Sequence, residues 1–309
     1  MFCKTLEYVL QNAKITAINI FLHEGVHKIS VDSPVLSESI NEIIGSSHGN
    51  ISTIYASKLQ IRNEQSNIRT SIMFWKVNFE ETTIFMKGSH IVINFTDCMF
   101  KDAVMDNEGD LIISLDLNFL NCIWKSTRKR NQISIKNVIM LHFRAKSCNF
   151  HNKIMFIKSN YFSIHFEGVT FSYSSLQEND SFELIKVEKI MYGWFLVRNS
   201  IIFKKVSVFT SETDRKIFRP FLNIYSEAMN LTISDSNFTN MNRVLKVGYR
   251  HNPGKRDGIF LNVAINNCMF SSVSTKRDGG AILIMLSKIM IPMICADIHI
   301  VKCRFNQSI

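Results

Sequence analysis

The clearest pattern in the chain is a short unit of alternating apolar and polar positions. Residues 262–270 show it best: two apolar residues alternate with spacers, two polar residues follow, and a small residue and an aromatic complete the unit. Alternation turns one side of an extended chain inward. Asn, Asp and Ser tolerate the bent backbone where the alternation breaks. Each unit therefore predicts a strand, a corner and a second strand.

The same unit recurs along most of the chain. The clear copies are Ile93, Phe95, Cys98, Phe100; Leu117, Phe119, Cys122, Trp124; Ile164, Phe166, Val169, Phe171; Leu231, Ile233, Ser236, Phe238; Val263, Ile265, Cys268, Phe270; and Ile298, Ile300, Cys303, Phe305. Looser copies are Ile72, Phe74, Val77, Phe79, and the set Phe143, Cys148, Phe150. Recurrence at intervals of about 20–50 residues is typical of repeat architectures.

A single unit cannot bury its own inner side, whereas coils stacked about 4.8 Å apart bury it and hydrogen-bond to one another. The pattern therefore predicts an all-β chain in which residues 15–309 form the coils of a parallel β-helix, a single-stranded solenoid. We expect one domain over residues 1–309. The alternative is a β-sandwich, whose short strands also recur. A sandwich does not place the same residue classes at the same phase of so many units.

The start of the chain carries a different periodicity. Over residues 5–13, Leu6, Val9, Leu10 and Ala13 fall on one face of a helix, and Thr5 is suited to cap its first turn. A solenoid needs a cover over its first open coil. We therefore predict a short N-terminal capping helix.

Residues 15–29 predict a strand, a turn at Glu24-Gly25 and a second strand. The same stretch contains His23-Glu24-Gly25-Val26-His27, which matches the His-Glu-x-x-His motif of zinc hydrolases. That motif needs a helix, so that both histidines face one metal ion. On a strand the two side chains stand about 13 Å apart. A zinc hydrolase through His23, Glu24 and His27 is kept as an alternative function.

Three phrases at the start resemble the opening of right-handed parallel β-helix proteins of the pectin-lyase-like superfamily. They are Cys-x-Thr-Leu-x-Tyr at 3–8, Leu-x-x-Gly-x-His-x-Ile at 22–29 and Ile-Ile-Gly at 43–45. Gly-Gly-Ala-Ile at 279–282 is similar to the repeats of polymorphic outer-membrane proteins, although Val273 stands where those repeats carry Asn. The resemblance implies a right-handed helix and is informative about fold rather than activity.

Apolar residues make up 46% of the 309 residues, which is enough for a large core. There are seven cysteines, and five of them stand at one phase of the repeat: Cys98, Cys122, Cys148, Cys268 and Cys303. Registered neighbours would have parallel Cβ directions, which is poor disulfide geometry. We expect buried, unbridged thiols that act as small apolar groups.

The net charge is +10, which is compatible with acidic partners. Lys and Arg are scattered over outward positions, however, and the densest run, residues 125–130, is expected to be a solvated loop. Insertions occur near 176–183, 210–219 and 248–258. The last is basic and rich in Gly and Pro, which predicts a projecting loop. Projecting loops carry function on rigid scaffolds, so we predict a binding loop formed by Tyr249, Arg250, His251, Lys255, Arg256 and Asp257.

Catalysis is not favoured by the sequence. Asp257-Gly258-Ile259 resembles part of the polygalacturonase phrase Asn-Thr-Asp-Gly-Ile, but Lys255-Arg256 replace Asn-Thr, and that family's Asp-Asp, His-Gly and Arg-x-Lys phrases are not found downstream. Glycoside hydrolysis needs paired carboxylates, and lyase members need an acidic calcium cluster with a basic proton acceptor. We assign no catalytic residue, no metal and no cofactor. A degenerate polysaccharide-active lyase or glycoside hydrolase remains an alternative.

The favoured function is a non-catalytic extracellular or cell-surface module for adhesion, spacing, or glycan or protein binding. A binder of anionic polymers is a further class; the scattered charge disfavours nucleic acid. The apolar run 281–296 is shorter than the about 20 residues of a membrane span and contains Lys288 and Pro292, so we expect two strands about a corner at Ser287-Lys288. No secretory signal is visible at the start. Both ends look truncated, and we expect a fragment of a longer secreted or surface protein, with membrane contact only through other parts.

Overall fold

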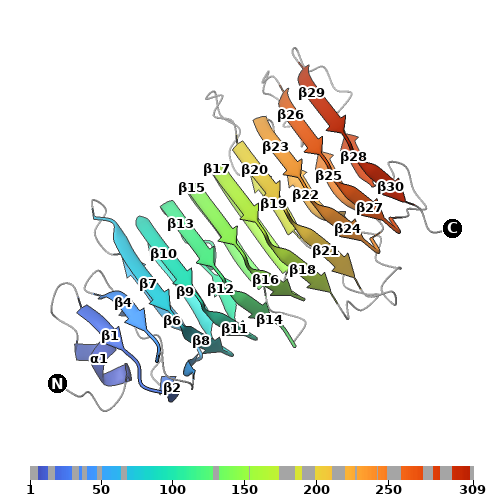
Figure 1. Ribbon diagram of the computed structural model, residues 1–309. Helices are drawn as coiled ribbons and strands as arrows, with labels where there is room; N and C mark the ends of the chain where they lie inside the picture. The colour runs from blue at the N-terminus through green and yellow to red at the C-terminus, as the bar shows by residue number, and fades with distance from the viewer. Residues whose placement is uncertain are drawn as a thin grey trace.

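In the computed structural model the chain forms an elongated stack of coils, with its two ends at opposite ends of the stack (Figure 1). The structure describes residues 6–12, 18–29, 35–36, 40–46, 51–63, 68–127, 132–152, 154–173, 185–189, 199–210, 220–226, 228–241, 243–248, 259–273, 281–285 and 294–306. Strands pair in parallel with their counterparts in neighbouring coils, in a 19-stranded and an 11-stranded sheet. The predicted all-β parallel β-helix with a short N-terminal helix is confirmed.

The coil has three faces, which we number in chain order. Face 1 holds the longer strands, each paired with its equivalent one coil away: β1 (Ile18–Phe21), β4 (Ile40–Ile44), β7 (Thr70–Trp75), β10 (His90–Thr96), β13 (Ile112–Leu120), the second part of β15 (Gln132–Lys146), the second part of β17 (Ile154–Glu167), β20 (Asn199–Lys204), β23 (Ala228–Ser234), β26 (Ile259–Asn266) and β29 (Ile294–Val301).

Face 2 is the 11-stranded sheet: β2 (Gly25–Ile29), β5 (Ser52–Ala56), β8 (Val77–Glu80), β11 (Met99–Lys101), β14 (Ile123–Lys125), β16 (Asn149–His151), β18 (Thr170–Tyr173), β21 (Ser207–Thr210), β24 (Asn237–Thr239), β27 (Met269–Ser271) and β30 (Arg304–Asn306). Face 3 returns to the larger sheet: β3 (Val35–Leu36), β6 (Leu59–Asn63), β9 (Thr83–Gly88), β12 (Val104–Asp106), the first parts of β15 and β17, β19 (Ile185–Lys189), β22 (Pro220–Tyr225), β25 (Arg243–Gly248) and β28 (Ile282–Met285).

The core consists of registered columns of apolar side chains. Equivalent rings stack from coil to coil: Phe74 and Phe95 lie 5.1 Å apart between ring centroids, and Phe100 and Trp124 lie 3.9 Å apart. Rings of face 1 meet rings of face 2 edge to face, as in the pair of Phe74 and Phe79. Removing one such buried ring typically costs about 3–5 kcal/mol. The inward positions predicted from the repeat are therefore the core, except in the last copy.

The last copy differs because no described strand stacks on its far side. Phe305 on β30 is 53% exposed, and Ile298 and Ile300 on β29 are 43% and 44% exposed. Within each strand they keep the phase of their buried counterparts, since Phe305 pairs with Phe270. Burial of an inward residue thus depends on having a neighbour on both sides.

The corner between faces 1 and 2 has the same backbone in most coils. Its first residue adopts a positive φ of 53–61° in the coils that carry Asp97, Asn121, Ser147, Gly168, Lys205, Asp235, Asn267 and Lys302. Asn, Asp, Ser and Gly suit this left-handed conformation. The polar pair that breaks the alternation in the sequence is therefore the corner, as predicted.

The cysteines follow that corner residue, and their thiols are free, as expected. Cys98, Cys122, Cys148 and Cys268 are buried, and burial raises the pKa of the Cys268 thiol to about 11. They are more than apolar fillers, however. Cys98 Sγ lies 3.3 Å from the carbonyl oxygen of Thr96 and 3.4 Å from that of Phe74, so the thiol donates to corner carbonyls. Ser236 takes the same place and donates to Ser234 O at 2.7 Å.

One coil was missed by the sequence pattern. Residues 201–208 form an unpredicted copy in which Ile201, Phe203, Val206 and Val208 are all buried. Val208 pairs with Phe171 on one side and Phe238 on the other, so it occupies the column of anchor aromatics. The copy was overlooked because its anchor is aliphatic and the neighbouring Phe209 points to solvent, 46% exposed.

The N-terminal helix α1 spans Leu6–Asn12. Leu6 and Leu10 are buried in the core cluster, Val9 packs against it, and the helix contacts β2 and β3. The capping helix is thus confirmed at its described residues; Thr5 and Ala13 lie outside them. In the apolar run 281–296, β28 and the start of β29 are strands, and the expected corner at 287–288 lies outside the described residues. No helix in the described part of the chain is long and apolar enough to cross a membrane.

Candidate functional site

The binding loop predicted at 248–258 lies almost entirely outside the described residues. Of its positions only Gly248, the last residue of β25, is described. Tyr249, Arg250, His251, Lys255, Arg256 and Asp257 therefore stay predictions. Gly248 nevertheless shows where the loop leaves the solenoid: at the end of a strand of face 3.

The His-Glu-x-x-His stretch does not form a helix. His23 and Glu24 are exposed in the bend before β2, whereas His27 lies on β2 in register with Ile54, which pairs with the core residue Phe79. His27 Nε2 donates to the carbonyl oxygen of His23 at 2.9 Å. Within the described ranges no group of three or more His, Cys, Asp or Glu side chains is arranged to hold a metal ion. The helical arrangement that this zinc motif requires is therefore not formed.

The outer side of face 3 carries a row of alternating cations and rings, which we call the lysine–aromatic stack. It comprises Lys136, Phe156, Lys186, Tyr225 and Lys246, one from each of five consecutive strands of the face. Each lysine Nζ lies near the centroid of a neighbouring ring. The distances are 5.8 Å for Lys136 over Phe156, 5.4 Å for Lys186 over Phe156, 5.8 Å for Lys186 over Tyr225 and 6.0 Å for Lys246 over Tyr225.

Strand alternation and register place these side chains. Ile185 and Val187 point into the core, so Lys186 and Glu188 point outward. Phe156 on β17 pairs in register with Lys186 on β19, and Asn223 on β22 pairs with Lys246 on β25. Tyr225 stands two residues after Asn223 on β22, so it belongs to the neighbouring row of outward positions. Contacts between an ammonium and a ring within about 6 Å contribute roughly 0.5–1 kcal/mol each at exposed sites. The stack is thus a product of sheet register, with each ring holding lysines on either side.

Two neighbours fix the ends of the stack. A Cβ atom at Gly248 would lie 3.2 Å from Cε1 of Tyr225, so the ring of Tyr225 rests on the glycine backbone. At the other end the buried side chain of Asn107 holds the backbone of Lys136, accepting from its N–H at 2.9 Å and donating to its carbonyl oxygen. The positions of Tyr225 and Lys136 are therefore set by close contacts.

The lysines of the stack differ in whether a neighbouring carboxylate already neutralises them. Lys186 Nζ lies 2.7 Å from Glu188 Oε1, and the two side chains are only 28% and 13% exposed. This central pair is neutral as a unit and fixes the middle of the stack. By contrast, Lys136, Lys246 and the nearby Lys158 form no ion pair with any described residue. They are the cations that an incoming anion can reach.

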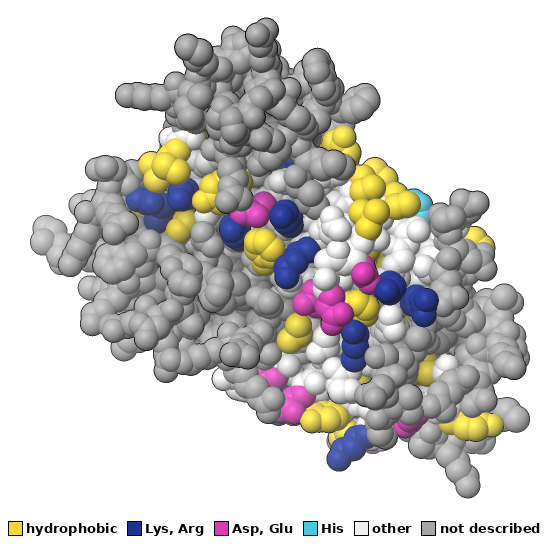
Figure 2. Space-filling view, turned by 180° about the vertical axis from the view of Figure 1, so that it is seen from behind, with side chains coloured by type: hydrophobic (Ala, Val, Ile, Leu, Met, Phe, Trp, Pro, Cys, Tyr) yellow, Lys and Arg dark blue, Asp and Glu magenta, His cyan; other side chains and the backbone are white. Residues whose placement is uncertain are grey.

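Figure 2 shows this side of the molecule, viewed from behind relative to Figure 1. Lysine and arginine side chains lie in a diagonal band among hydrophobic and acidic ones. In the sequence, the basic residues 128–130 precede β15 and the basic stretch 250–256 follows β25; both lie outside the described residues.

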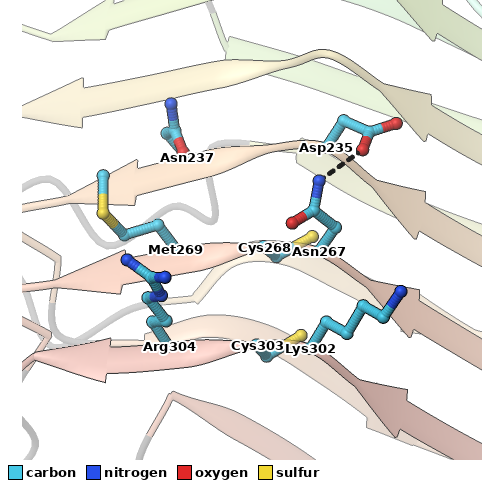
Figure 3. Close-up of a pocket in the computed structure, with 8 residues that line it drawn as sticks. All are labelled: Asp235, Asn237, Asn267, Cys268, Met269, Lys302, Cys303 and Arg304. Carbon is cyan, nitrogen blue, oxygen red and sulfur yellow. Dashed lines mark hydrogen bonds between the residues drawn. The ribbon is translucent and has the colours of Figure 1, made fainter.

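A groove of about 640 Å³ lies on the corner between faces 1 and 2, near the last described coils (Figure 3). Its lining consists of Asp235, Asn237, Asn267, Cys268, Met269, Lys302, Cys303 and Arg304. Asn267 Nδ2 donates to Asp235 Oδ1 at 2.8 Å. Because a carboxylate and two cations share this short groove, its electrostatics favour no class of ligand.

Comparisons with known proteins add no assignment: no protein family, no curated protein and no solved structure matches the chain. The parallel β-helix therefore rests on the strand pairing itself. The lysine–aromatic stack was not foreseen from the sequence. Its members come from strands about 20–40 residues apart, a spacing within the period of repeat architectures, and only the register places them in one row.

Proposed function

We propose that this protein is a non-catalytic β-helix module that binds an extended glycan or protein along the lysine–aromatic stack. We further propose that it acts outside the cell or at the cell surface and is a distant relative of the pectin-lyase-like superfamily. Kinship is supported by the parallel coils together with the Gly-containing opening at 22–29.

The observation that carries the proposal is the set of lysines and rings that crosses five strands of face 3 along the solenoid axis. Successive strands of a sheet are about 4.8 Å apart, so an extended polymer lying along the axis can contact several of these side chains. A rigid solenoid also costs little ordering entropy on binding, because its surface is already organised. Gly248, the last described residue before the predicted binding loop, lies against Tyr225.

The test is binding of the full chain to a panel of neutral and acidic polysaccharides, with polymer size followed in the same samples. We expect retention of one class of polymer with no loss of chain length over hours. The variant Lys246→Gln should weaken binding about threefold, the effect of one exposed charge contact. Lys28→Gln, on face 2, is the matched control and should leave binding unchanged.

Shortening of any polysaccharide would overturn the non-catalytic proposal. Its loss in Asp257→Asn would then support the enzyme alternative instead. Equal weakening by Lys246→Gln and Lys28→Gln would show that net charge, rather than the stack, governs binding.

A further inference from the structure

The ring faces in the stack are already occupied. Phe156 has Lys136 and Lys186 against it, and Tyr225 has Lys186 and Lys246 against it. Neutral glycans and unpaired nucleobases are usually held by stacking on open aromatic faces. An approaching ligand meets ammonium groups here instead of open rings. The stack is therefore built to hold cations in place.

Among the described residues of this row, the cations without an ion pair are lysines. Lys136, Lys158 and Lys246 lack a carboxylate partner among the described residues, whereas Lys186 is neutralised by Glu188. Arginine presents a planar fork that matches planar carboxylates with two parallel hydrogen bonds. Lysine presents a compact point charge with three donors and no fixed plane. Such a charge suits a compact anion that accepts hydrogen bonds from several directions and stays ionised at every physiological pH.

The side chains of the stack are also unlike those that bind an anionic ligand through a bridging calcium ion. Calcium needs six to eight oxygen ligands, supplied mainly by carboxylates and carbonyls. The described outward positions of these strands carry lysines, rings and Asn223, and the one carboxylate among them, Glu188, is engaged by Lys186 at 2.7 Å. An anionic ligand would therefore contact the ammonium groups directly.

We propose that the lysine–aromatic stack binds a sulfated polysaccharide through direct contacts between lysine ammonium groups and sulfate esters. This inference rests on the proposed function and names the ligand class of the same site. The sulfates contact Lys136, Lys158 and Lys246, while Phe156 holds the ammonium group of Lys136 and Tyr225 holds that of Lys246. The polymer lies along the solenoid axis, crossing the strands of face 3.

The experiment measures binding of the full chain to dextran sulfate, polygalacturonate, neutral dextran and oligo(dT) by calorimetry, at several NaCl concentrations and with or without EDTA. We expect dextran sulfate to bind most tightly, with affinity falling as salt rises and no effect of EDTA. Replacing Lys136, Lys158 and Lys246 together by Gln should lower that affinity more than about tenfold, as expected for the loss of three charge contacts from partly exposed side chains.

The control variant replaces Lys28, Lys125 and Lys205 by Gln, which removes the same charge from other surfaces. It should change the affinity less than about twofold, because distant exposed charges are screened by salt. Circular dichroism checks that both triple variants are folded. If the stack variant does not fold, Lys246→Gln alone replaces it, with an expected loss of about threefold.

Several outcomes would overturn the sulfate assignment. These are tighter binding of polygalacturonate, dextran or oligo(dT), loss of binding in EDTA, or equal losses in the two triple variants. If another polysaccharide binds and the stack variant loses it, the proposed function stands and only the sulfate assignment fails. If no polysaccharide binds the folded protein, both fail as glycan-binding proposals.

Discussion

The two ends of face 3 use the same residue types with opposite results. Near the N-terminal end, Lys58 lies 3.8 Å from the ring centroid of Phe85 but pairs with Glu108 at 3.2 Å, and Lys87 pairs with Asp110 at 3.2 Å. Further along the face, from β15 to β25, Lys136, Lys158 and Lys246 form no ion pair with a described residue.

The turn at residues 106–110 connects faces 3 and 1. It places carboxylates beside Lys58 and Lys87, whereas toward Lys136 it presents Asn107, whose side-chain amide bonds the Lys136 backbone. The same turn thus neutralises two lysines and leaves the ammonium group of a third without an ion pair. The predictions below test this contrast, from the largest expected effect to the smallest.

The largest difference concerns stability. Lys186→Met would leave Glu188, only 13% exposed, without its cation. We expect a loss of about 1–3 kcal/mol, less than the roughly 3–5 kcal/mol seen for fully buried pairs. Lys87→Met breaks a pair whose side chains are 47% and 40% exposed, and exposed pairs contribute about 0.2–1 kcal/mol. Urea unfolding of both variants measures the difference; equal losses would mean that the central pair is not specially placed.

The ring of Tyr225 is expected to matter for ligand binding. Tyr225→Leu removes the surface that holds Lys186 and Lys246, at about 0.5–1 kcal/mol for each contact. We expect polymer binding to weaken about three- to tenfold. Tyr225→Phe keeps the ring and loses the hydrogen bond that Asn223 Nδ2 donates to the Tyr225 hydroxyl at 3.3 Å. Titration calorimetry should place it within twofold of the unaltered chain; a Phe variant as weak as Leu would contradict a role for the ring.

Removing the carboxylate partners of Lys58 and Lys87 should extend the binding surface toward the N-terminal end of face 3. In the double variant Glu108→Gln with Asp110→Asn, Lys58 and Lys87 lose their carboxylate partners. Each exposed charge contact contributes little, so we expect affinity for an anionic polymer to rise about two- to threefold. The control is Glu7→Gln, which alters an acidic residue of the capping helix. Unchanged affinity in the double variant would show that this end of face 3 lies beyond the reach of the ligand.

The smallest expected effect is at Gly248. A Cβ atom there would lie 3.2 and 3.3 Å from two carbons of the Tyr225 ring. We expect Gly248→Ala to tilt the ring and weaken binding about twofold, with little change in stability, since crowding of one methyl group is partly relieved by a side chain that can move. The test compares it with Gly109→Ala, where no atom lies within 4 Å of the added Cβ but the φ of 85° itself strains alanine. Only Gly248→Ala should change binding.

Much of the core could be foreseen because its signal is local. The inward residues of a copy, such as Ile93, Phe95 and Phe100, are two to five positions apart, and alternation decides their side of the strand. The coil at residues 201–208 was not predicted, because Val208 takes the position that an aromatic residue fills in other coils and no local feature of the sequence marks it. The donor role of Cys98 also needed the structure, since it depends on carbonyl groups of the corner and of the preceding coil.

The functional surface was mostly beyond the reach of sequence reasoning. A basic loop at 249–257 was predicted from composition, and its junction with Gly248 lies at the stack. The stack itself joins residues from five strands, and none of the five is unusual alone. Lys186 and Lys136 are both outward lysines in the pattern, yet one is neutralised and the other available.

The amino-acid sequence determined which side chains face inward, where the chain bends between faces 1 and 2, and that the coils stack in parallel. These follow from alternation and backbone preference, which act over a few residues. The tertiary structure alone decided which outward residues become neighbours. Register between coils depends on the length of every intervening turn, so a ring and the lysines beside it meet only once all the coils are stacked.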